Sequence, residues 1–361
     1  MNNKSITILF PIHGLVPRGG LKVAYEYANR LCRDGYNVHI VYPALPFMGK
    51  QSLISRIKYS LKFIVYRFFI GYSCRKWFPL YDNVQEHYLY SLDYKYVPKT
   101  DYYIATAVET AIFLNTYKIP DKNKLYLIQD FENWRFSDKI VKETYNFGFK
   151  NIVISNWLAE IVKETGADYT LIKNGFDFDC FKMDIPINKK NRFKVAMMFS
   201  TQQRKGCNYG FEALEIVKNN YPELSVSIFG VHPEPQQLPN YCTYYRNPNR
   251  ECLNRIYNES AIFLAPSIKE GWGLPIGEAM ICGCAVVCTE NKGFREMAEN
   301  RVTALMSPTR DSQSLAENII CLIEDDDLRK TIARRGCDNI KKFKWDDSYR
   351  LLKQLLGDDT P

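Results

Sequence analysis

Two glutamates stand eight positions apart in a glycine-rich stretch whose residue types suit the recognition of a sugar. The stretch reads EGWGLPIGEAM over residues 270–280, and its only acidic residues are Glu270 and Glu278. Glycines leave backbone amides accessible in a turn, and Pro275 suits the first turn of a helix. A single glutamate here would more often compensate the helix dipole. The pair, next to the glycines, instead favours bidentate hydrogen bonds to the vicinal hydroxyls of a sugar or ribose.

Two other short segments could bind a diphosphate. Arg204-Lys205-Gly206 follows an expected strand and precedes an expected helix, so its two cations would neutralise phosphate charge at the end of that strand. A solvated basic turn is the alternative. Gly19-Gly20 also stands between a strand and a helix, where bare glycine backbone lets an anion approach helix N-terminal amides. A tight turn without a ligand is the alternative for this segment.

Several other chemistries are excluded by the motifs that the sequence lacks. It contains no G-x-x-x-x-G-K-[ST] phosphate loop, and the first glycine-rich loop reads GLVPRGG rather than the G-x-G-x-x-G of nicotinamide-cofactor domains. Its 11 cysteines are odd in number and form no C-x-x-C pair, which argues against a secreted disulfide framework. The apolar run 6–10 is too short for a signal peptide, and Arg67 interrupts the longest apolar stretch. We therefore expect a cytoplasmic protein.

The elements that position these residues alternate between strands and helices in two series. The 361 residues are about right for two domains. The first series predicts a helix over 21–33 and strands at 6–10, 38–41, 102–106, 125–129 and 151–155. The second predicts helices over 209–219, 253–258 and 275–282 and strands at 193–199, 225–229, 261–265 and 285–289.

This alternation predicts an α/β fold of two Rossmann-like, doubly wound domains that face each other across a central cleft. Ligands would then bind at the carboxyl ends of the strands. We expect a first domain over residues 1–175, a linker over 176–192 and a second domain over 193–340. A terminal helix within 341–361 is expected to return to the first domain.

Taken together and in this order, Gly19-Gly20, Asn174-Gly175, Arg204-Lys205-Gly206 and the Glu270/Glu278 pair resemble the retaining GT-B glycosyltransferases of family 4. The resemblance covers nearly the whole chain, and its most specific part is EGWGLPIGEAMICGCAVVCT over residues 270–289. Through Gln129-Asp130-Phe131-Glu132, the chain looks most like the branch that contains bacterial rhamnosyltransferases.

The resemblance implies a role for each matching residue. Arg204 and Lys205 would hold the donor diphosphate, and Glu278 would bind the ribose hydroxyls. Glu270 would face the donor sugar, with the backbone of Gly271, Trp272, Gly273 and Leu274 nearby. The resemblance also implies that the first domain binds the acceptor and the second binds the donor. Gly19 and Gly20 would let the first domain close on the phosphate. No metal or other cofactor is expected, and Asp177 and Asp179 are not read as a metal motif.

Positions 129 and 130 bear on the donor and the acceptor. Many relatives carry a His-Asp pair here, and that histidine contacts the C6 hydroxyl of the donor sugar. This chain has Gln129-Asp130, which predicts a 6-deoxy sugar such as rhamnose, carried by dTDP, although another hexose fits as well. Asp130, Gln129 and His13 are candidates for acceptor orientation, and Asp130 is also counted among the candidate catalytic residues with Arg204, Lys205 and Glu270. For His13, a histidine that caps its loop is the alternative.

The net charge of +8 is concentrated in one segment. No acidic residue lies between Asp34 and Asp82, where seven lysines and arginines are found, which leaves +1 for the rest of the chain. This distribution argues against nucleic acid as a partner. Within 52–69 the apolar residues recur at helical spacing beside these cations. Residues 50–78 therefore predict either peripheral binding to the anionic inner face of a membrane or a helix packed on its own domain.

The sequence thus predicts a retaining hexosyltransferase of cell-surface polysaccharide assembly. Its partners would be a nucleotide-sugar donor and a saccharide or lipid-linked saccharide acceptor. Two alternatives stay open: a non-catalytic nucleotide-sugar-binding protein, and a sugar-nucleotide epimerase with the same fold.

Overall fold

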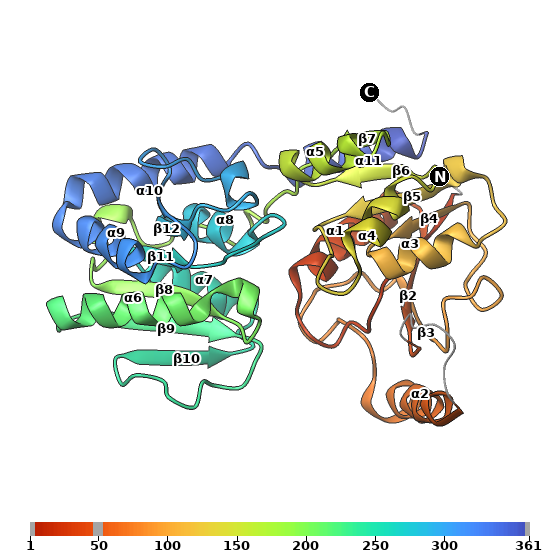
Figure 1. Cartoon of the computed structure of the whole chain (residues 1–361), viewed down its shortest axis with the longest axis horizontal. Coiled ribbons are helices and arrows are strands. Elements are labelled where there is room, and N and C mark those ends of the chain that lie inside the picture. Colours follow the sequence, from red (N-terminus) through yellow and green to blue (C-terminus); the bar gives the residue numbers. More distant parts are fainter. Residues whose placement is uncertain (1–3, 46–52, 358–361) are drawn as a thin grey trace. The chain divides into compact units, whose positions relative to one another are not determined.

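The computed structural model describes residues 4–45 and 53–357. The chain divides into two compact units, of which unit 1 comprises Met1–Lys173 and Ser348–Pro361 and unit 2 comprises Asn174–Asp347. In each unit the described strands form one parallel sheet, and helices lie between most of the successive strands (Figure 1). The predicted α/β class, with two doubly wound units, is confirmed.

The sheet of unit 1 has the strand order β3-β2-β1-β4-β5-β6-β7. Its predicted strands and its first helix appear within about two residues of their expected bounds. Strands β3 and β7 were not predicted, because β3 begins with three polar residues and β7 has only three residues. The strands are β1 (Ser5–Leu9), β2 (Asn37–Pro43), β3 (Gln85–Leu89), β4 (Tyr102–Ala105), β5 (Lys124–Ile128), β6 (Lys150–Val153) and β7 (Tyr169–Leu171). The helices include α1 (Gly19–Arg33), α3 (Val108–Asn115), α4 (Asp138–Tyr145) and α5 (Asn156–Glu164).

The sheet of unit 2 has the order β10-β9-β8-β11-β12-β13. Its four predicted strands are confirmed, whereas the two edge strands β10 and β13 were not predicted. The strands are β8 (Lys194–Phe199), β9 (Ser225–Gly230), β10 (Cys242–Arg246), β11 (Ile262–Ala265), β12 (Ala285–Thr289) and β13 (Ala304–Ser307). The helices are α6 (Cys207–Asn220), α7 (Arg250–Glu259), α8 (Leu274–Ile281), α9 (Ser312–Glu324) and α10 (Asp326–Ile340).

In both units the strand order reverses beside the first strand, which lies between β2 and β4 in unit 1 and between β9 and β11 in unit 2. At such a reversal the connections leave toward opposite faces of the sheet, and a crevice opens at the carboxyl ends of the two central strands. The Gly19-Gly20 segment follows β1, while Arg204-Lys205 and Glu270 follow β8 and β11. The topology therefore places the residues that we predicted to bind phosphate and sugar at the points where the strand order reverses.

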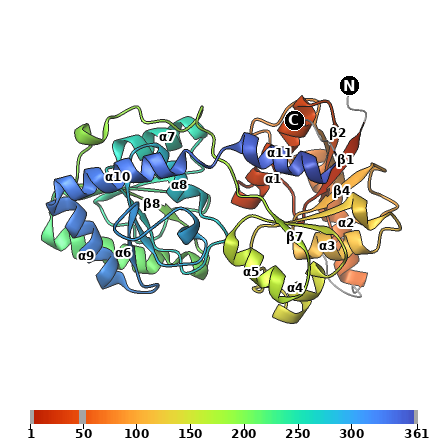
Figure 2. The ribbon, with the colours of Figure 1, turned by 90° about the horizontal axis from the view of Figure 1, so that it is seen from above.

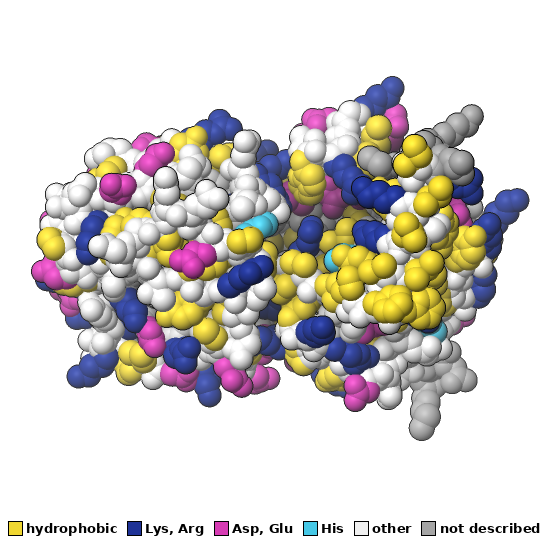
Figure 3. Space-filling model, turned by 90° about the horizontal axis from the view of Figure 1, so that it is seen from below, with side chains coloured by type: hydrophobic (Ala, Val, Ile, Leu, Met, Phe, Trp, Pro, Cys, Tyr) yellow, Lys and Arg dark blue, Asp and Glu magenta, His cyan; other side chains and the backbone are white. Residues whose placement is uncertain are grey.

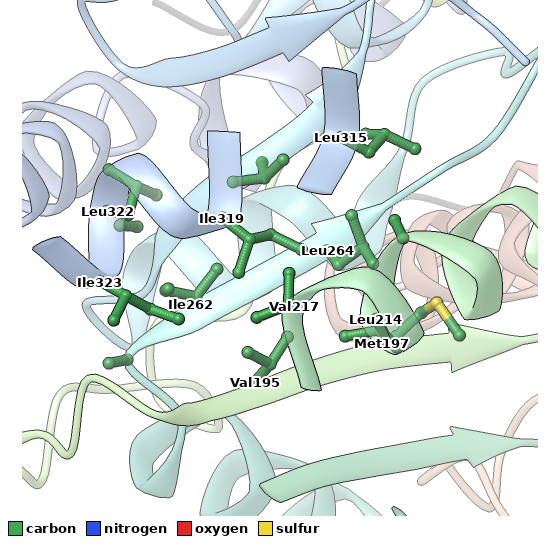
Figure 4. Close-up of a cluster of buried hydrophobic side chains, with 14 of the residues drawn as sticks. Val195, Met197, Leu214, Val217, Ile262, Leu264, Leu315, Ile319, Leu322 and Ile323 are labelled. Carbon is green, nitrogen blue, oxygen red and sulfur yellow. The ribbon is translucent and has the colours of Figure 1, made fainter. Parts of the chain in front are cut away.

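The core of unit 2 lies between its sheet and the helices α6 and α9 (Figure 4). Leu214 and Val217 of α6 and Leu315 and Ile319 of α9 meet strand residues such as Ile262, all of them fully buried. Because side chains alternate along a strand, Phe263 points to the opposite face. There it packs edge to face against Tyr257 of α7. The two central strands are covered on both faces, which fixes the positions of the loops that follow them.

The segment that we expected as a linker, 176–192, belongs to unit 2. Asp177 forms an ion pair with Arg250 of α7, and the backbone amide of Asp184 donates to Asn258 at 2.7 Å. The buried Lys190 ammonium donates to the carbonyls of Tyr257 and Ser260 at 2.9 and 3.0 Å. It thereby provides hydrogen bonds to backbone carbonyls at the carboxyl end of α7. These bonds attach the segment to α7 along much of its length.

The last helix, α11 (Trp345–Leu355), crosses from unit 2 into unit 1 along the chain (Figure 2). Lys4 donates to the carbonyl of Leu356 at 3.0 Å, Tyr102 donates to the same carbonyl at 2.8 Å, and Lys150 donates to that of Leu355 at 2.6 Å. The end of α11 therefore lies at the amino ends of β1, β4 and β6. The helix that we expected within 341–361 packs on unit 1 from Ser348 onward.

One helix of unit 1, α2 (Leu53–Val65), projects from the body of that unit (Figure 1). It continues into a π-helical turn, η1 (Tyr66–Ile70), which ends at Gly71, where φ is 92°. Across the described part of the chain, every helix is too short or too polar to cross a bilayer.

Candidate functional site

In unit 2, a lysine and a glutamate from different loops meet at the reversal point of the sheet. Lys205 lies in a short 3₁₀ turn after β8, and its ammonium contacts the Oε1 atom of Glu270 at 2.6 Å. The hydroxyl of Ser267 donates to the same oxygen at 2.8 Å. The Lys205 and Glu270 side chains are only 15% and 9% exposed. Two of the predicted site residues, 65 positions apart in sequence, thus form one charged pair.

The backbone joins the two loops independently of this pair. The amides of Ile268 and Lys269 donate to the carbonyl of Arg204 at 2.8 and 3.2 Å. The next turn requires a glycine, because Gly206 has φ of 58° and a β-carbon there would lie 2.2 Å from the carbonyl oxygen of Pro266. The backbone therefore positions the loop that carries Arg204 and Lys205 against the loop that carries Glu270.

The turn that precedes α8 brings the N-terminus of this helix close to Glu270. Gly273 is the N-cap of α8 with φ of 100°, and Pro275 lies in the first helical turn. A β-carbon at Gly273 would approach the ring of Phe294 to 2.6 Å. Residues after β12 hold the preceding loop, since Asn291 donates to the carbonyl of Ser267 at 2.9 Å. A small pocket at this point is lined by residues that include Ser267, Glu270, Pro275 and Phe294.

Glu278 lies inside α8 and is buried. The hydroxyl of Tyr257 donates to its Oε2 atom at 3.2 Å. Burial raises the pKa of Tyr257 well above its usual value, and the charge of Glu278 raises it further, so this phenol stays protonated and remains a donor. Sequence reasoning missed Tyr257, because its hydrogen bond to Glu278 forms only when α7 and α8 pack together.

The remaining predicted residues of this stretch differ in their exposure to a ligand. Arg204 donates from Nε to Gln202 at 3.0 Å. The turn Gly271–Leu274 reaches α8 as expected, but the Trp272 side chain is buried and packs edge to face on Phe343 with centroids 5.3 Å apart. Trp272 can therefore offer a ligand its backbone but not its ring. Ser267, which holds Glu270, stands only three residues before it, so its sequence position could have identified it.

In unit 1, the structure brings together Gly20 and Gln129. Gly19 and Gly20 form the exposed start of α1, and the Gln129 amide nitrogen donates to the carbonyl of Gly20 at 3.0 Å. Gln129 thereby connects the end of β5 to the first turn of α1. The start of α1 retains exposed amide backbone of the kind that binds anions.

His13 and Asp130 also lie beyond the carboxyl ends of strands in unit 1. Asp130 follows β5, and its Oδ1 atom accepts a bond from the amide of Phe131 at 2.9 Å. His13 stacks on Tyr66 with centroids 4.8 Å apart, and its buried Nδ1 atom has no hydrogen-bond partner. Burial lowers the pKa of His13, and the charges of Lys62 and Arg18 lower it further. His13 does not cap its loop through Nδ1.

A carboxylate that sequence reasoning did not assign to a site is Glu132. It accepts a bond from the amide of Val108, at the start of α3, at 2.9 Å. Burial raises its pKa to about 8, and the charges of Glu109 and Asp130 also raise it. The neighbouring Glu109 forms an ion pair with Arg135. Within the described residues, no cluster of three or more histidine, cysteine or acidic side chains could hold a metal ion.

Most of unit 2 is similar in sequence to a known protein family. Residues 181–338 match the family model of the glycosyl transferases group 1. The chain is 33% identical over 109 residues to O-antigen chain mannosyltransferase B of Escherichia coli, which covers 28% of each protein. It is 33% identical over 82 residues to the N,N'-diacetylbacillosaminyl-diphospho-undecaprenol alpha-1,3-N-acetylgalactosaminyltransferase of Campylobacter jejuni, covering 23% of this chain and 22% of that protein. The chain thus spans about a quarter of the length of these curated relatives.

A solved structure extends the comparison to the whole chain. HepE of Anabaena, in complex with UDP-glucose, superposes with a TM-score of 0.72 and 17% identity, covering 98% of this chain and 100% of that one. At this identity the likeness shows the fold alone. The expected GT-B fold of two Rossmann-like domains is confirmed.

Proposed function

We propose that this chain is a glycosyltransferase of group 1 that moves a sugar from a nucleoside diphosphate sugar to a saccharide or lipid-linked saccharide acceptor. The observation that supports this proposal is the Lys205–Glu270 pair at the reversal point of unit 2, within the segment that matches the family model. A cation and a carboxylate at one point suit a donor that carries a diphosphate at one end and sugar hydroxyls at the other.

The cations act on the leaving group. Cleavage of the sugar–phosphate bond develops negative charge on the departing diphosphate and positive charge on the sugar ring. Lys205 and Arg204 are fixed where the negative charge would grow, and fixed charges stabilise a transition state without reorganisation. Lys205 is paired with Glu270, so a phosphate that binds Lys205 would free this carboxylate to accept hydrogen bonds from the sugar.

The carboxylate of Glu278 suits the ribose of the nucleotide. One oxygen is held by Tyr257, which orients the side chain inside α8. We assign Glu278 to the vicinal hydroxyls, which donate hydrogen bonds that a carboxylate accepts.

We further propose that the configuration at the sugar is retained. The acceptor hydroxyl would attack from the face of the leaving group and pass its proton to the departing phosphate, so that no side-chain base is required. His13 and Asp130 would orient the acceptor. We expect no metal requirement, because lysine and arginine supply the positive charge, and turnover should therefore persist in the presence of a strong chelator.

The environment of the Gln129 side chain supports our proposal for the donor sugar. Its amide nitrogen is engaged with Gly20, which supports a role in joining β5 to α1 rather than in binding a sugar C6 hydroxyl. A 6-deoxy sugar such as rhamnose, carried by dTDP, is therefore our first candidate. Preference for UDP-glucose over dTDP-rhamnose in direct competition would refute this assignment.

Support for a lipid-linked acceptor comes from a relative. The matching Campylobacter protein is named for a diphospho-undecaprenol acceptor. We propose an acceptor of the same chemical class, used at the surface of a membrane in polysaccharide assembly.

The test is a screen of nucleotide sugars for release of nucleoside diphosphate, with mass analysis of the product. Free nucleoside diphosphate together with a new glycoside is expected. Binding without turnover would instead indicate a nucleotide-sugar-binding protein. Conversion of the nucleotide sugar without an acceptor would indicate an epimerase.

A further inference from the structure

The helix α2 and the turn η1 present a continuous aliphatic and aromatic surface to solvent. Ile54 and Phe69 are each 80% exposed, and Ile57 and Leu61 are more than half exposed. We call this surface the α2 face; it consists of Ile54, Ile57, Leu61, Ile64, Phe68 and Phe69. Exposed apolar patches of this kind on a folded protein mark interaction sites. Figure 3 shows hydrophobic side chains gathered beside lysines and arginines on the part of unit 1 that carries α2.

The opposite side of the helix attaches it to unit 1. Phe63 stacks on Tyr88 of β3 with centroids 5.8 Å apart and an interplanar angle of 11°. Tyr66 contacts Tyr88 and stacks on His13. An ordinary surface helix buries its aliphatic stripe. Here the half-buried Phe63 of α2 and Tyr66 of η1 face unit 1, and the aliphatic stripe of α2 faces outward. The expectation that this stripe packs on its own domain is therefore wrong.

The charges around the α2 face are all positive. Arg56, Lys58 and Arg67 are exposed and Lys62 is half-buried, and the sequence has no acidic residue from Gly35 to Tyr81. The positive surface is smaller than the expected 50–78, because Arg75 forms ion pairs with Asp82 and Glu86. Residues 50–52 of that range, with Lys50, lie outside the described residues.

We propose that the α2 face docks on an anionic lipid bilayer. The apolar side chains would enter the boundary between headgroups and acyl chains, and the flanking cations would meet lipid phosphates. The absence of acidic residues from position 35 to position 81 of the sequence favours an anionic surface over a second copy of this chain. This proposal deepens the proposed function, because it locates where a lipid-linked acceptor would be met.

The segment after the helix connects this surface to a candidate acceptor loop. The amide of Gly14 donates to the carbonyl of Tyr72 at 3.0 Å, and the indole of Trp77 donates to the carbonyl of Gly14 at 2.6 Å. A β-carbon at Gly14 would lie 2.7 Å from the hydroxyl of Tyr25, so this loop is closely packed. Docking of the α2 face would therefore place the loop that carries His13 beside the lipid headgroups.

The experiment is co-sedimentation of the full chain with vesicles, without donor. Vesicles of phosphatidylglycerol and phosphatidylcholine are compared with vesicles of phosphatidylcholine alone, at low and at high salt. We expect binding to the anionic vesicles that weakens with salt. Arg56→Gln with Lys58→Gln should weaken this binding about 30-fold, from two lost cations. The matched control exchanges the exposed Lys118 and Lys163 of the same unit for glutamine and should bind as the wild type does.

The apolar contribution is tested by Ile57→Glu with Leu61→Glu, which should lower vesicle binding at least about tenfold while the thermal unfolding curve is unchanged, since both side chains are exposed. Ile140→Glu, on α4 of the same unit, is its control. Three outcomes would overturn the proposal: absence of binding to anionic vesicles at low salt, wild-type binding by the Ile57/Leu61 variant, or a dimer in solution that this variant abolishes. Sugar transfer to a water-soluble acceptor, measured separately, tests the proposed function on its own.

Discussion

At the residue level, the contact between Lys205 and Glu270 joins two oppositely charged side chains inside unit 2. Each group is largely withdrawn from water, and a buried charge without a partner is costly. Because the two groups carry opposite charges, their contact offsets that cost. Ser267 holds Glu270 through a second hydrogen bond.

The Lys205→Ala variant should lose about 10²–10³-fold in turnover, because the leaving diphosphate loses a fixed cation. Its free energy of unfolding should fall by about 3–5 kcal/mol, since Glu270 is left as a buried carboxylate without its cation. Release of nucleoside diphosphate and chemical denaturation measure the two effects. Lys194→Ala is the matched control, because it also breaks an ion pair, to Glu259 at 2.7 Å in the same unit. Equal turnover in the two variants would remove Lys205 from the phosphate site.

Glu132 should make stability depend on pH in a defined direction. Its pKa rises from 4.5 to about 8 on folding, so between these values the folded protein binds a proton that the unfolded chain releases. Stability then falls as pH increases from about 5 to 8, by at most about 1.4 kcal/mol per pH unit. In Glu132→Gln this contribution disappears, because the amide oxygen still accepts the Val108 bond without a charge.

The measurement is chemical denaturation of the wild type and Glu132→Gln at several pH values. The difference in stability between them should grow in favour of the variant toward pH 8. Glu160→Gln, an exposed position on α5, should keep the wild-type slope. A constant difference between wild type and Glu132→Gln across this window would contradict the raised pKa.

At the level of elements, the site depends on how closely two loops approach. Because a β-carbon at Gly206 would lie 2.2 Å from a backbone oxygen, Gly206→Ala must move the loop of Lys205 away from that of Glu270. The left-handed backbone alone costs an alanine about 1–2 kcal/mol. We expect a larger loss of stability than this, together with a loss of turnover.

The control for Gly206→Ala is Gly166→Ala, where φ is 80° and a β-carbon would meet no atom within 4 Å. This variant should show only the cost of about 1–2 kcal/mol from the backbone conformation and should keep full turnover. Thermal unfolding and donor turnover are measured for both variants. Equal losses of stability in the two would show that the loops do not have to approach so closely.

At the level of the whole molecule, the chain builds unit 1 from two distant segments. Leu352 and Leu356 at the end of α11 are buried in unit 1. Leu352→Ala should therefore destabilise unit 1 by about 2–5 kcal/mol. Hydrogen exchange should accelerate in β1, β4 and β6 while β8, β11 and β12 of unit 2 keep their protection. Equal acceleration in both sheets would indicate that the two units unfold together.

Much of the fold and of the site follows from local patterns. The central strands were predictable because they are rich in apolar residues, whereas the edge strands β3 and β10 each mix polar and aromatic residues and do not stand out. Glu270, Glu278, Arg204 and Lys205 were identifiable because each stands beside glycines or at a strand end. These signals depend on neighbours in sequence, which the chain shows directly.

Tertiary structure alone decided the partners of these residues and the direction of the α2 stripe. Lys205 and Glu270 are 65 positions apart, and Tyr257 and Glu278 are 21 apart, so only the packing of the sheet and its helices brings them into contact. Helical periodicity showed that α2 is amphipathic, but a period does not tell which face the domain can cover. Phe63 packs on Tyr88 and Tyr66 packs on His13. These contacts orient the helix so that its aliphatic stripe faces the solvent.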